Sequence, residues 1–405
     1  MTMTRRTVLA AAAMAAGLGL AQAQEPIKIG AINPYSGPLA QYGDEATRGF
    51  ELGVEAINAA GGIGGRKLVI VRGDAGNPQQ GIAAVEKLVS QDKVDLFMGT
   101  YISAVANAAS DAAARHGKIY FEAMALASDL TERGLPNFIR GGPNATHFAE
   151  RSVQAMLEFI APKLNKKPNE LKVWIEHEDT IYGTSIAQVQ KRLLEAAGAK
   201  VVGVGSHNFR AIDLNDAILR ASNAQPDIWV GTGYVPDNTL LLRTMRDQGF
   251  KPPVAMLLGT GDSADFREAL GDFMEGVFVV GYPHADLSEA FAPGAAAFVK
   301  TYKAKYNRDP VAPQSLSAFT EMMILRDLLT AAGGTEMQKV RAAAAATDKP
   351  LKTYTNGYGV KFDDKMQNQR AIPNMVQWQG GKTVTVFPTE AAMAGTTLVN
   401  IPRAK

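Results

Sequence analysis

Two short segments of the sequence carry residue types that could do chemistry. His177, Glu178 and Asp179 are consecutive and could offer imidazole and carboxylate ligands to a metal ion. Because neighbouring residues at the end of a strand point in different directions, we expect an ordinary loop there. Residues 61–65 (GGIGG) have the glycine content of a phosphate-binding loop, but they follow a predicted helix instead of opening one. The second segment therefore predicts a helix stop and a tight turn.

The sequence contains no motif of a known catalytic site. It has no G-x-S-x-G, H-E-x-x-H or P-loop pattern. The five histidines lack the spacing of metal ligands, and the absence of cysteine excludes thiol nucleophiles, cysteine–zinc sites and iron–sulfur clusters. Carboxylates are plentiful, but spacing singles out none of them. We therefore expect a protein that is not an enzyme, with no catalytic residues, no cofactor and no metal site.

The first 23 residues form a predicted export signal. Arg5 and Arg6 precede an apolar stretch from Val8 to Leu20, and residues 21–23 (AQA) fit a cleavage site. The apolar stretch is too short to span a hydrocarbon core of ~30 Å comfortably. The paired arginines also match a twin-arginine signal, so the Sec and Tat routes both stay open. The signal predicts a periplasmic protein.

The composition predicts a soluble protein with a large core. The chain has 42 Lys and Arg against 40 Asp and Glu, and loss of Arg5 and Arg6 makes these numbers equal. No basic excess is then left to bind nucleic acid or an anionic membrane. An exported chain without cysteine must gain its stability from core packing, and this length favours two domains over one.

Alternating strands and helices must position any site. The alternation is predicted over residues 27–121 and restarts over residues 171–258. Two successive βαβαβ runs favour an α/β fold of two doubly wound lobes, each with a parallel sheet and helices on both faces. Two longer helices are expected around residues 290–306 and 315–332, followed by short strands that include residues 374–378.

Two segments that pair glycine with proline are predicted to cross between the lobes. They are residues 140–143 (RGGP) and 281–283 (GYP), although ordinary loops are the alternative. The resulting boundaries assign the chain as follows: residues 24–141 and 282–356 to the N-terminal lobe, residues 142–281 and 357–390 to the C-terminal lobe, and residues 391–405 to a tail.

The first hundred residues after the signal resemble a known family. Residues 34–43 (PYSGPLAQYG) and residues 56–67 (AINAAGGIGGRK) carry the resemblance. They resemble the leucine/isoleucine/valine-binding protein family, the type I periplasmic binding proteins of branched-chain amino-acid ABC importers. The resemblance weakens after about residue 285. It implies two lobes joined by a multi-strand hinge that closes on a small-molecule ligand, a membrane permease as partner, and a monomer.

The resemblance also implies a set of ligand contacts. Ser103, at the start of a predicted helix, matches a serine that binds the ligand carboxylate, since a hydroxyl and free backbone N–H groups suit an anion. A simple N-cap is the alternative role for Ser103. The other implied contacts would form an apolar, polarisable pocket with polar edges: Tyr42, Ile102, Met124, Leu126, Tyr182, Tyr234 and Asp262.

Two departures from the family pattern weaken recognition of an α-amino group. Leu126 stands where the amino-acid binders have a threonine, and leucine cannot hydrogen-bond to an ammonium group. Asp262 lies near the place of an expected glutamate, but its side chain is shorter. The predicted ligand is therefore either an amino acid with Asp262 as the ammonium partner, or a carboxylate or amide without an α-amino group. Glu122, at a strand end, is a further candidate to bind a ligand amine or amide.

Import is favoured over the alternative of a chemosensory or regulatory receptor for amides or aromatic acids. The predicted export signal and the lack of a fused signalling domain both point to a binding protein of an ABC importer. The alternative receptor would use the same fold and the same cleft.

Overall fold

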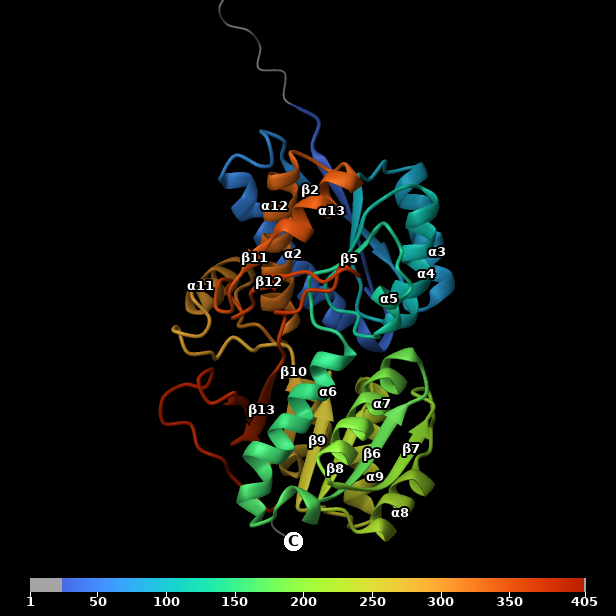
Figure 1. The fold of residues 1–405 in the computed structure, drawn as a ribbon, viewed down its shortest axis with the longest axis vertical. Helices are drawn as coiled ribbons and strands as arrows, with labels where there is room; N and C mark the ends of the chain where they lie inside the picture. Colours follow the sequence, from blue (N-terminus) through green and yellow to red (C-terminus); the bar gives the residue numbers. More distant parts are fainter. Residues whose placement is uncertain (1–23, 404–405) are drawn as a thin grey trace, which may run out of the picture.

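The computed structural model describes residues 24–403, which form two α/β lobes stacked along the long axis of the molecule (Figure 1). The predicted export signal lies outside the described residues. No helix in the described part of the chain is long and apolar enough to cross a membrane. Each lobe contains one large sheet, and the two sheets are separate.

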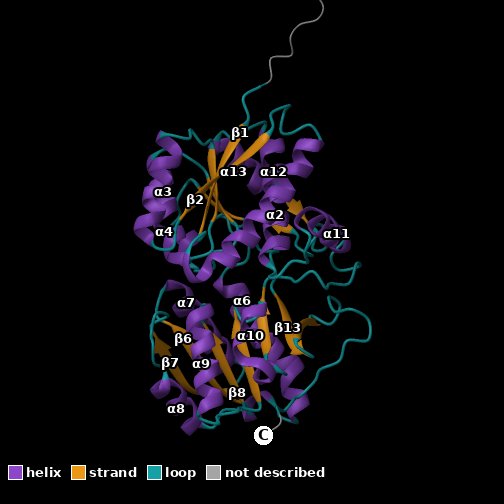
Figure 2. Cartoon of the chain, turned by 180° about the vertical axis from the view of Figure 1, so that it is seen from behind, coloured by secondary structure: helices purple, strands orange, loops and turns teal. Residues whose placement is uncertain are grey.

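The N-terminal lobe is built on a five-stranded sheet in which all neighbouring strands run parallel, in the order β2-β1-β3-β4-β5. The strands are β1 (Ile27–Asn33), β2 (Leu68–Asp74), β3 (Leu96–Gly99), β4 (Tyr120–Glu122) and β5 (Phe138–Arg140). The helices are α2 (Ala40–Ala59), α3 (Pro78–Ser90), α4 (Ser103–Arg115), α5 (Asp129–Glu132), α11 (Ala295–Tyr306), α12 (Gln314–Ala332) and α13 (Met337–Ala346). Helices α3 and α4 lie on one side of the sheet, and α2 and α12 lie on the other (Figure 2).

The C-terminal lobe is built on a seven-stranded sheet with the order β14-β13-β10-β9-β8-β6-β7. Its strands are β6 (Lys172–Glu178), β7 (Lys200–His207), β8 (Ile228–Thr232), β9 (Val254–Leu258), β10 (Phe278–Gly281), β13 (Asn374–Gln379) and β14 (Lys382–Phe387). Its helices are α6 (Ala145–Gln154), α7 (Ile181–Ala196), α8 (Asn215–Ala224), α9 (Val235–Asp247) and α10 (Ala264–Leu270), and α6 continues as a π-helical segment, η2 (Ala155–Ile160). Short 3-10 turns are η1 (Gly37–Leu39), η3 (Ala161–Leu164), η4 (Pro168–Glu170) and η5 (Gly271–Met274).

Strands β6 to β10 of the C-terminal sheet are parallel, as expected, and two late strands extend the sheet in the antiparallel sense. Strand β13 pairs antiparallel with β10, and β14 pairs antiparallel with β13. Only Gly380 and Gly381 connect β13 to β14, and both have positive φ. A two-residue hairpin can join only antiparallel strands, because a parallel pair needs a long crossover.

The third passage between the lobes lies later than the predicted boundary at residue 357. Strand β12 (Val360–Lys361) pairs with β11 (Asp348–Lys349), and Gln367 forms a bridge with Arg140 at the end of β5. The Asn368 side chain donates to the Gly141 carbonyl at 2.9 Å. These contacts keep the chain beside the N-terminal lobe up to Asn368, so the passage occurs between there and β13. Two-residue strands carry no periodic signal, which explains the misplaced boundary.

The segment expected to be a tail packs on the C-terminal lobe. It runs along the outside of the lower lobe (dark red in Figure 1). The Gln377 side chain donates to the Val399 carbonyl at 2.8 Å and accepts from the Val399 N–H at 3.0 Å. The Arg403 N–H donates to the Pro253 carbonyl at 2.8 Å. Residues up to 403 are therefore part of the folded lobe.

Candidate functional site

A small cavity lies between the lobes, at the carboxyl ends of their strands. It is lined by Tyr101, Met124, Leu126, Tyr182, Tyr234, Gly259 and Tyr282. We call it the inner cavity. Each residue lies within a few positions of the end of a strand, and Tyr182 also lies in the first turn of α7, the helix after β6. The carboxyl ends of parallel strands are where open α/β sheets bind ligands. The cavity volume is about 10 Å³, room for about one water molecule, so the lobes stand closed.

Tyrosine rings from both lobes close the inner cavity. Tyr101 of the N-terminal lobe stacks on Tyr42, with ring centroids 5.0 Å apart, and meets Tyr234 of the C-terminal lobe at 6.2 Å. Tyr182 lies 5.2 Å from Tyr234. Burial raises the pKa of each of these hydroxyls, and that of Tyr282, well above its usual value. The hydroxyls therefore stay neutral at physiological pH.

Tyrosine hydroxyls join the segments around the inner cavity, and one of them bonds across the two lobes. The Tyr42 hydroxyl bonds to the Ser263 hydroxyl of the other lobe at 3.3 Å. The Tyr282 hydroxyl, on the passage after β10, donates to the Met124 carbonyl. The Tyr182 hydroxyl donates to the Leu258 carbonyl within its own lobe at 2.9 Å. These bonds tie lobe closure to the geometry of the site.

Ser103 is the first residue of α4 and is buried beside this cluster. Its hydroxyl oxygen accepts from the backbone N–H groups of Leu126 at 3.2 Å and Ala127 at 3.1 Å. The N-cap is Ile102, so the alternative role of Ser103 as a simple N-cap is wrong. The Ser103 backbone N–H interacts with the Tyr234 hydroxyl and opposes the effect of burial on its pKa. The start of α4 thus presents N–H donors toward the cleft, as an anion site needs.

Glu122 does not face the cleft. Its Oε1 accepts from the backbone N–H groups of Thr100 at 2.6 Å and of Met124 and Ala125 at 2.8 Å each. Its Oε2 accepts from the Thr100 hydroxyl at 2.8 Å. Burial raises the pKa of Glu122 to about 8, and these donors oppose the rise. The hypothesis that Glu122 binds a ligand amine is therefore wrong, because its oxygens are used to shape the loop after β4.

Arg140 holds the same loop from the other side. Its guanidinium donates to the carbonyls of Ala125 at 3.0 Å and Ala127 at 2.8 Å, and to the Thr131 hydroxyl at 3.1 Å. It also donates to the Gln367 side chain. Arg140 is fully buried, and burial lowers its pKa to about 10. The loop that carries Met124 and Leu126 is therefore held by the Glu122 carboxylate and the Arg140 guanidinium. No sequence pattern predicts that these two residues act on the same loop.

Asp262 does not line the inner cavity. Its Oδ2 lies 3.0 Å from His284 Nε2. Burial acts to lower the His284 pKa, but the interaction with Asp262 outweighs burial, and the pKa of His284 is raised. Asp262 instead lines a separate polar cavity of about 180 Å³, together with His284 and Asp286. The structure thus brings together four of the predicted contacts in the inner cavity: Met124, Leu126, Tyr182 and Tyr234. Ser103 and Tyr42 contact this group, and Ile102 lies on a neighbouring groove.

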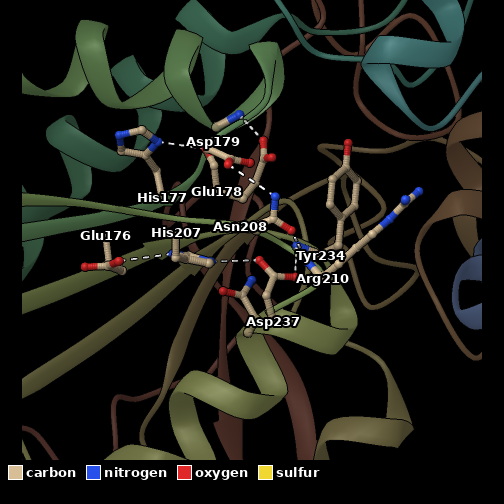
Figure 3. A network of polar contacts seen from close by, with 12 residues as sticks. Glu176, His177, Glu178, Asp179, His207, Asn208, Arg210, Tyr234 and Asp237 are labelled. Carbon is tan, nitrogen blue, oxygen red and sulfur yellow. Dashed lines mark hydrogen bonds and ion pairs between the residues drawn. The ribbon is translucent and has the colours of Figure 1, made fainter. Parts of the chain in front are cut away.

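The segment 177–179 forms the polar end of β6, as Figure 3 shows. Glu178 accepts from the Thr180 N–H at 2.8 Å and the Gly183 N–H at 2.5 Å, and it therefore supports the first turn of α7. The His177 ring bonds to the Glu178 backbone carbonyl at 2.8 Å. Within residues 24–403, no group of three or more His, Cys, Asp or Glu side chains is arranged to hold a metal ion.

A buried triad supports Tyr234 from below (Figure 3). His207 Nδ1 lies 3.0 Å from Glu176 Oε1, and His207 Nε2 lies 3.1 Å from Asp237 Oδ2. Asp237 Oδ1 accepts from the Tyr234 N–H at 2.9 Å. Burial acts to lower the His207 pKa, but its hydrogen bonds with Asp237 and Glu176 raise it to about 9. The imidazolium therefore fixes the start of α9, where Tyr234 enters the inner cavity.

Sequence reasoning missed Tyr101, Gly259 and Tyr282. Tyr101 directly precedes Ile102 and Ser103, so its place at a strand end was a usable signal. The sequence places Tyr282 in a predicted bend between the lobes. Because that passage runs beside the inner cavity, the bend itself was a usable signal for a site residue. Gly259 lies against the Tyr182 hydroxyl, where a Cβ would come within 2.1 Å of the oxygen.

Comparison with known proteins gives one family. A model of the periplasmic binding proteins matches residues 26–392. Leu/Ile/Val-binding protein homolog 7 of Brucella suis biovar 1 is 37% identical over 378 residues, covering 93% of this chain and 95% of that protein. LivJ from Streptococcus pneumoniae, in complex with isoleucine, has a TM-score of 0.73 at 21% identity and covers 89% of this chain and 99% of its own. A solute binding protein of R. palustris in complex with benzoate has a TM-score of 0.75 at 23% identity, and the match covers 91% of this chain and 98% of that one.

The fold and these matches define the class of protein. The family model spans most of the sequence. The alignment with the Brucella relative covers nearly all of both chains, and more than a third of the aligned residues are identical. This chain therefore belongs to the periplasmic binding protein family, of the branched-chain amino acid transporter type. The predicted family and the two-lobed α/β fold are confirmed.

Proposed function

We propose that this protein captures a small carboxylate without an α-amino group between its lobes and delivers it to the membrane permease of an ABC importer. The observation that carries the proposal is the character of the inner cavity. The start of α4 and the Ser103 hydroxyl lie beside it, the hydroxyls of Tyr101 and Tyr234 line it, and none of its lining residues bears a carboxylate. Such a site offers donors to an anion, and it offers no lining carboxylate to an ammonium group.

Recognition of an α-amino acid would need an acidic partner, and no carboxylate among the described residues lines the inner cavity. Asp262 is turned toward His284 and lines a different cavity. Glu122 is used by the backbone of its own loop. An ammonium group buried without a partner costs several kcal/mol, which exceeds the gain from a small apolar side chain. Benzoate in the R. palustris relative is a carboxylate of the proposed kind, whereas isoleucine in LivJ is not.

The other parts of the proposal follow from the family. The protein acts in the periplasm as a monomer, without cofactor or nucleic acid, and releases its ligand unchanged. Hinge closure around the ligand makes the form that the permease recognises. Coupling of ligand and closure is supported by Tyr282, which lies on the passage between the lobes after β10 and also lines the inner cavity.

A matched ligand panel tests the proposal. The mature protein is titrated by calorimetry and thermal shift with leucine and 4-methylpentanoate, with phenylalanine and 3-phenylpropanoate, and with benzoate and benzamide. A ligand at about 100 times its Kd adds roughly 2.7 kcal/mol of stability. We expect shifts from the deaminated acids and not from the amino acids. Shifts from leucine or phenylalanine alone would refute the carboxylate proposal, and Asp262→Asn would then test the ammonium partner.

Uptake in cells separates import from sensing. Deleting the gene should abolish accumulation of the labelled ligand if the protein serves an importer. Normal accumulation with an altered transcriptional or chemotactic response would favour the receptor alternative.

A further inference from the structure

A second and larger hollow lies between the lobes, beside the inner cavity. Its volume is about 270 Å³. The N-terminal lobe contributes Pro34, Pro38 and Ile102 to its lining, among others, and the C-terminal lobe contributes Phe209, Arg210 and Tyr234. We call it the outer groove. Because both lobes form its walls, the groove takes its present shape only when the lobes are closed.

The outer groove continues the candidate site. Tyr234 lines both the groove and the inner cavity, and Ile102 of the groove directly precedes Ser103 at the start of α4. The inner cavity holds about 10 Å³, whereas the groove holds about 270 Å³. A ligand whose carboxylate meets the start of α4 can therefore extend its body past Tyr234 into the groove.

The lining of the groove specifies what that body should be. The proline, isoleucine, phenylalanine and tyrosine side chains present apolar surface, which favours a hydrocarbon or aromatic chain. Arg210 is the one charged residue of the lining, and its side chain is exposed to solvent. Its guanidinium lies 5.0 Å from the centroid of the Phe209 ring. Among the described residues, no carboxylate lies within ion-pair distance of this guanidinium.

Arg210 is held in place at the groove by its own loop. The Arg210 N–H donates to the Asn208 side chain at 2.9 Å, and Asn208 in turn donates to Asp179 at 3.3 Å. Figure 3 shows the side chains of Arg210 and Tyr234 extending away from the His207 triad. A guanidinium stacked on an aromatic ring loses less freedom when it binds a carboxylate, so it suits a second anionic group of a ligand.

We propose that the outer groove binds the distal part of the ligand, an elongated apolar body that ends in a second carboxylate paired with Arg210. The ligand class is thus a dicarboxylate with an aliphatic or aromatic spacer. This inference rests on the proposed function, because the first carboxylate is the one received at the start of α4.

Calorimetry with matched acids tests the inference. The dicarboxylates adipate, suberate and sebacate are compared with the monocarboxylates hexanoate, octanoate and decanoate, at low and high salt. For at least one chain length, we expect the diacid to bind about three- to tenfold more tightly than the monoacid, a preference that shrinks with salt. Arg210→Gln should abolish or reverse the preference, because a carboxylate would then enter an apolar groove unpaired.

The control variant is Arg192→Gln, which removes an exposed arginine of α7 that does not line the groove. It should keep the diacid preference, and both variants should keep the unfolding midpoint of the wild type. Equal binding of monoacids and diacids by the wild type, or a preference that persists in Arg210→Gln, overturns the inference while leaving the proposed function intact. Failure of every acid to bind, in this series and in the earlier panel, overturns both.

Discussion

The protonation of His207 offers a quantitative test of how the site is supported. Its two ring nitrogens face carboxylate oxygens of Glu176 and Asp237 at 3.0 and 3.1 Å. Only the imidazolium can donate from both nitrogens, so the folded state favours the charged form. Since Asp237 also accepts the Tyr234 N–H, loss of the charge should loosen the wall of the inner cavity as well as the fold.

The size of the effect follows from the pKa. Hydrogen bonds with Asp237 and Glu176 outweigh burial and raise the His207 pKa from 6.5 to about 9. That difference corresponds to about 3 kcal/mol of stability. Burial raises the Asp237 pKa even though the interaction with His207 acts to lower it. Part of the stabilisation from the His207–Asp237 pair therefore offsets the cost of burying the Asp237 carboxylate. The value of about 3 kcal/mol is thus an upper limit for the net contribution of the His207 charge to stability. Because the folded pKa is raised, the stabilisation is complete below about pH 6.5 and is lost as the pH rises through about 9.

Urea unfolding of the mature protein between about pH 6 and pH 10 measures this contribution. The wild type should lose up to about 3 kcal/mol across the upper part of this range, and His207→Gln should lose that amount already at neutral pH and show a flatter profile. Adding Asp237→Asn to His207→Gln should restore part of the stability, since one unpaired buried carboxylate is removed. His116→Gln, at a half-exposed histidine paired with Glu86, is the control. The same pH profile in wild type and His207→Gln would refute the reasoning.

Three further outcomes are expected. Ser103→Ala should weaken carboxylate binding at least tenfold in calorimetry, because it removes a donor to the ligand and the acceptor of two loop N–H groups. Arg140→Met should lower the free energy of unfolding in urea by roughly 3 kcal/mol or more, because the buried carbonyls of Ala125 and Ala127 lose their donor. Gly141→Ala should lower the free energy of unfolding in urea by about 1 to 3 kcal/mol, since its Cβ would lie 2.0 Å from Glu321 Oε2 and 2.6 Å from the Phe121 ring inside the N-terminal lobe.

These outcomes have matched controls. Ser185→Ala removes a half-buried hydroxyl that bonds only within α7, at the Ile181 carbonyl, and should leave ligand affinity unchanged. Gly76→Ala probes a glycine without positive φ whose Cβ would come no nearer than 3.4 Å to Gln80 Oε1, and it should leave the free energy of unfolding close to that of the wild type. Wild-type affinity in Ser103→Ala would contradict the anion site at α4. Wild-type stability in Arg140→Met would contradict the role of the guanidinium in the loop.

Strong local patterns made most of the architecture predictable. The apolar spacing at Phe50 and Ile57 lies on α2, and the alternation that begins at Ile27 lies on β1. The late elements were less predictable, because β11 and β12 span two residues each and pair only through the tertiary fold. The order of strands β10, β13 and β14 likewise depends on a passage between the lobes that has no local pattern.

The sequence by itself determined the two-lobed plan, the family, and the loops that carry Ser103, Tyr182 and Tyr234 to strand ends. These features depend on apolar periodicity and on motifs within a few residues of one another. Only the tertiary structure decided which side chains share the inner cavity, and it paired Asp262 with His284. A side chain at a strand end takes its direction from partners more than a hundred residues away, as between Tyr282 and Met124 or Tyr42 and Ser263. Such long-range contacts leave no trace in local spacing, because they form only when the lobes meet.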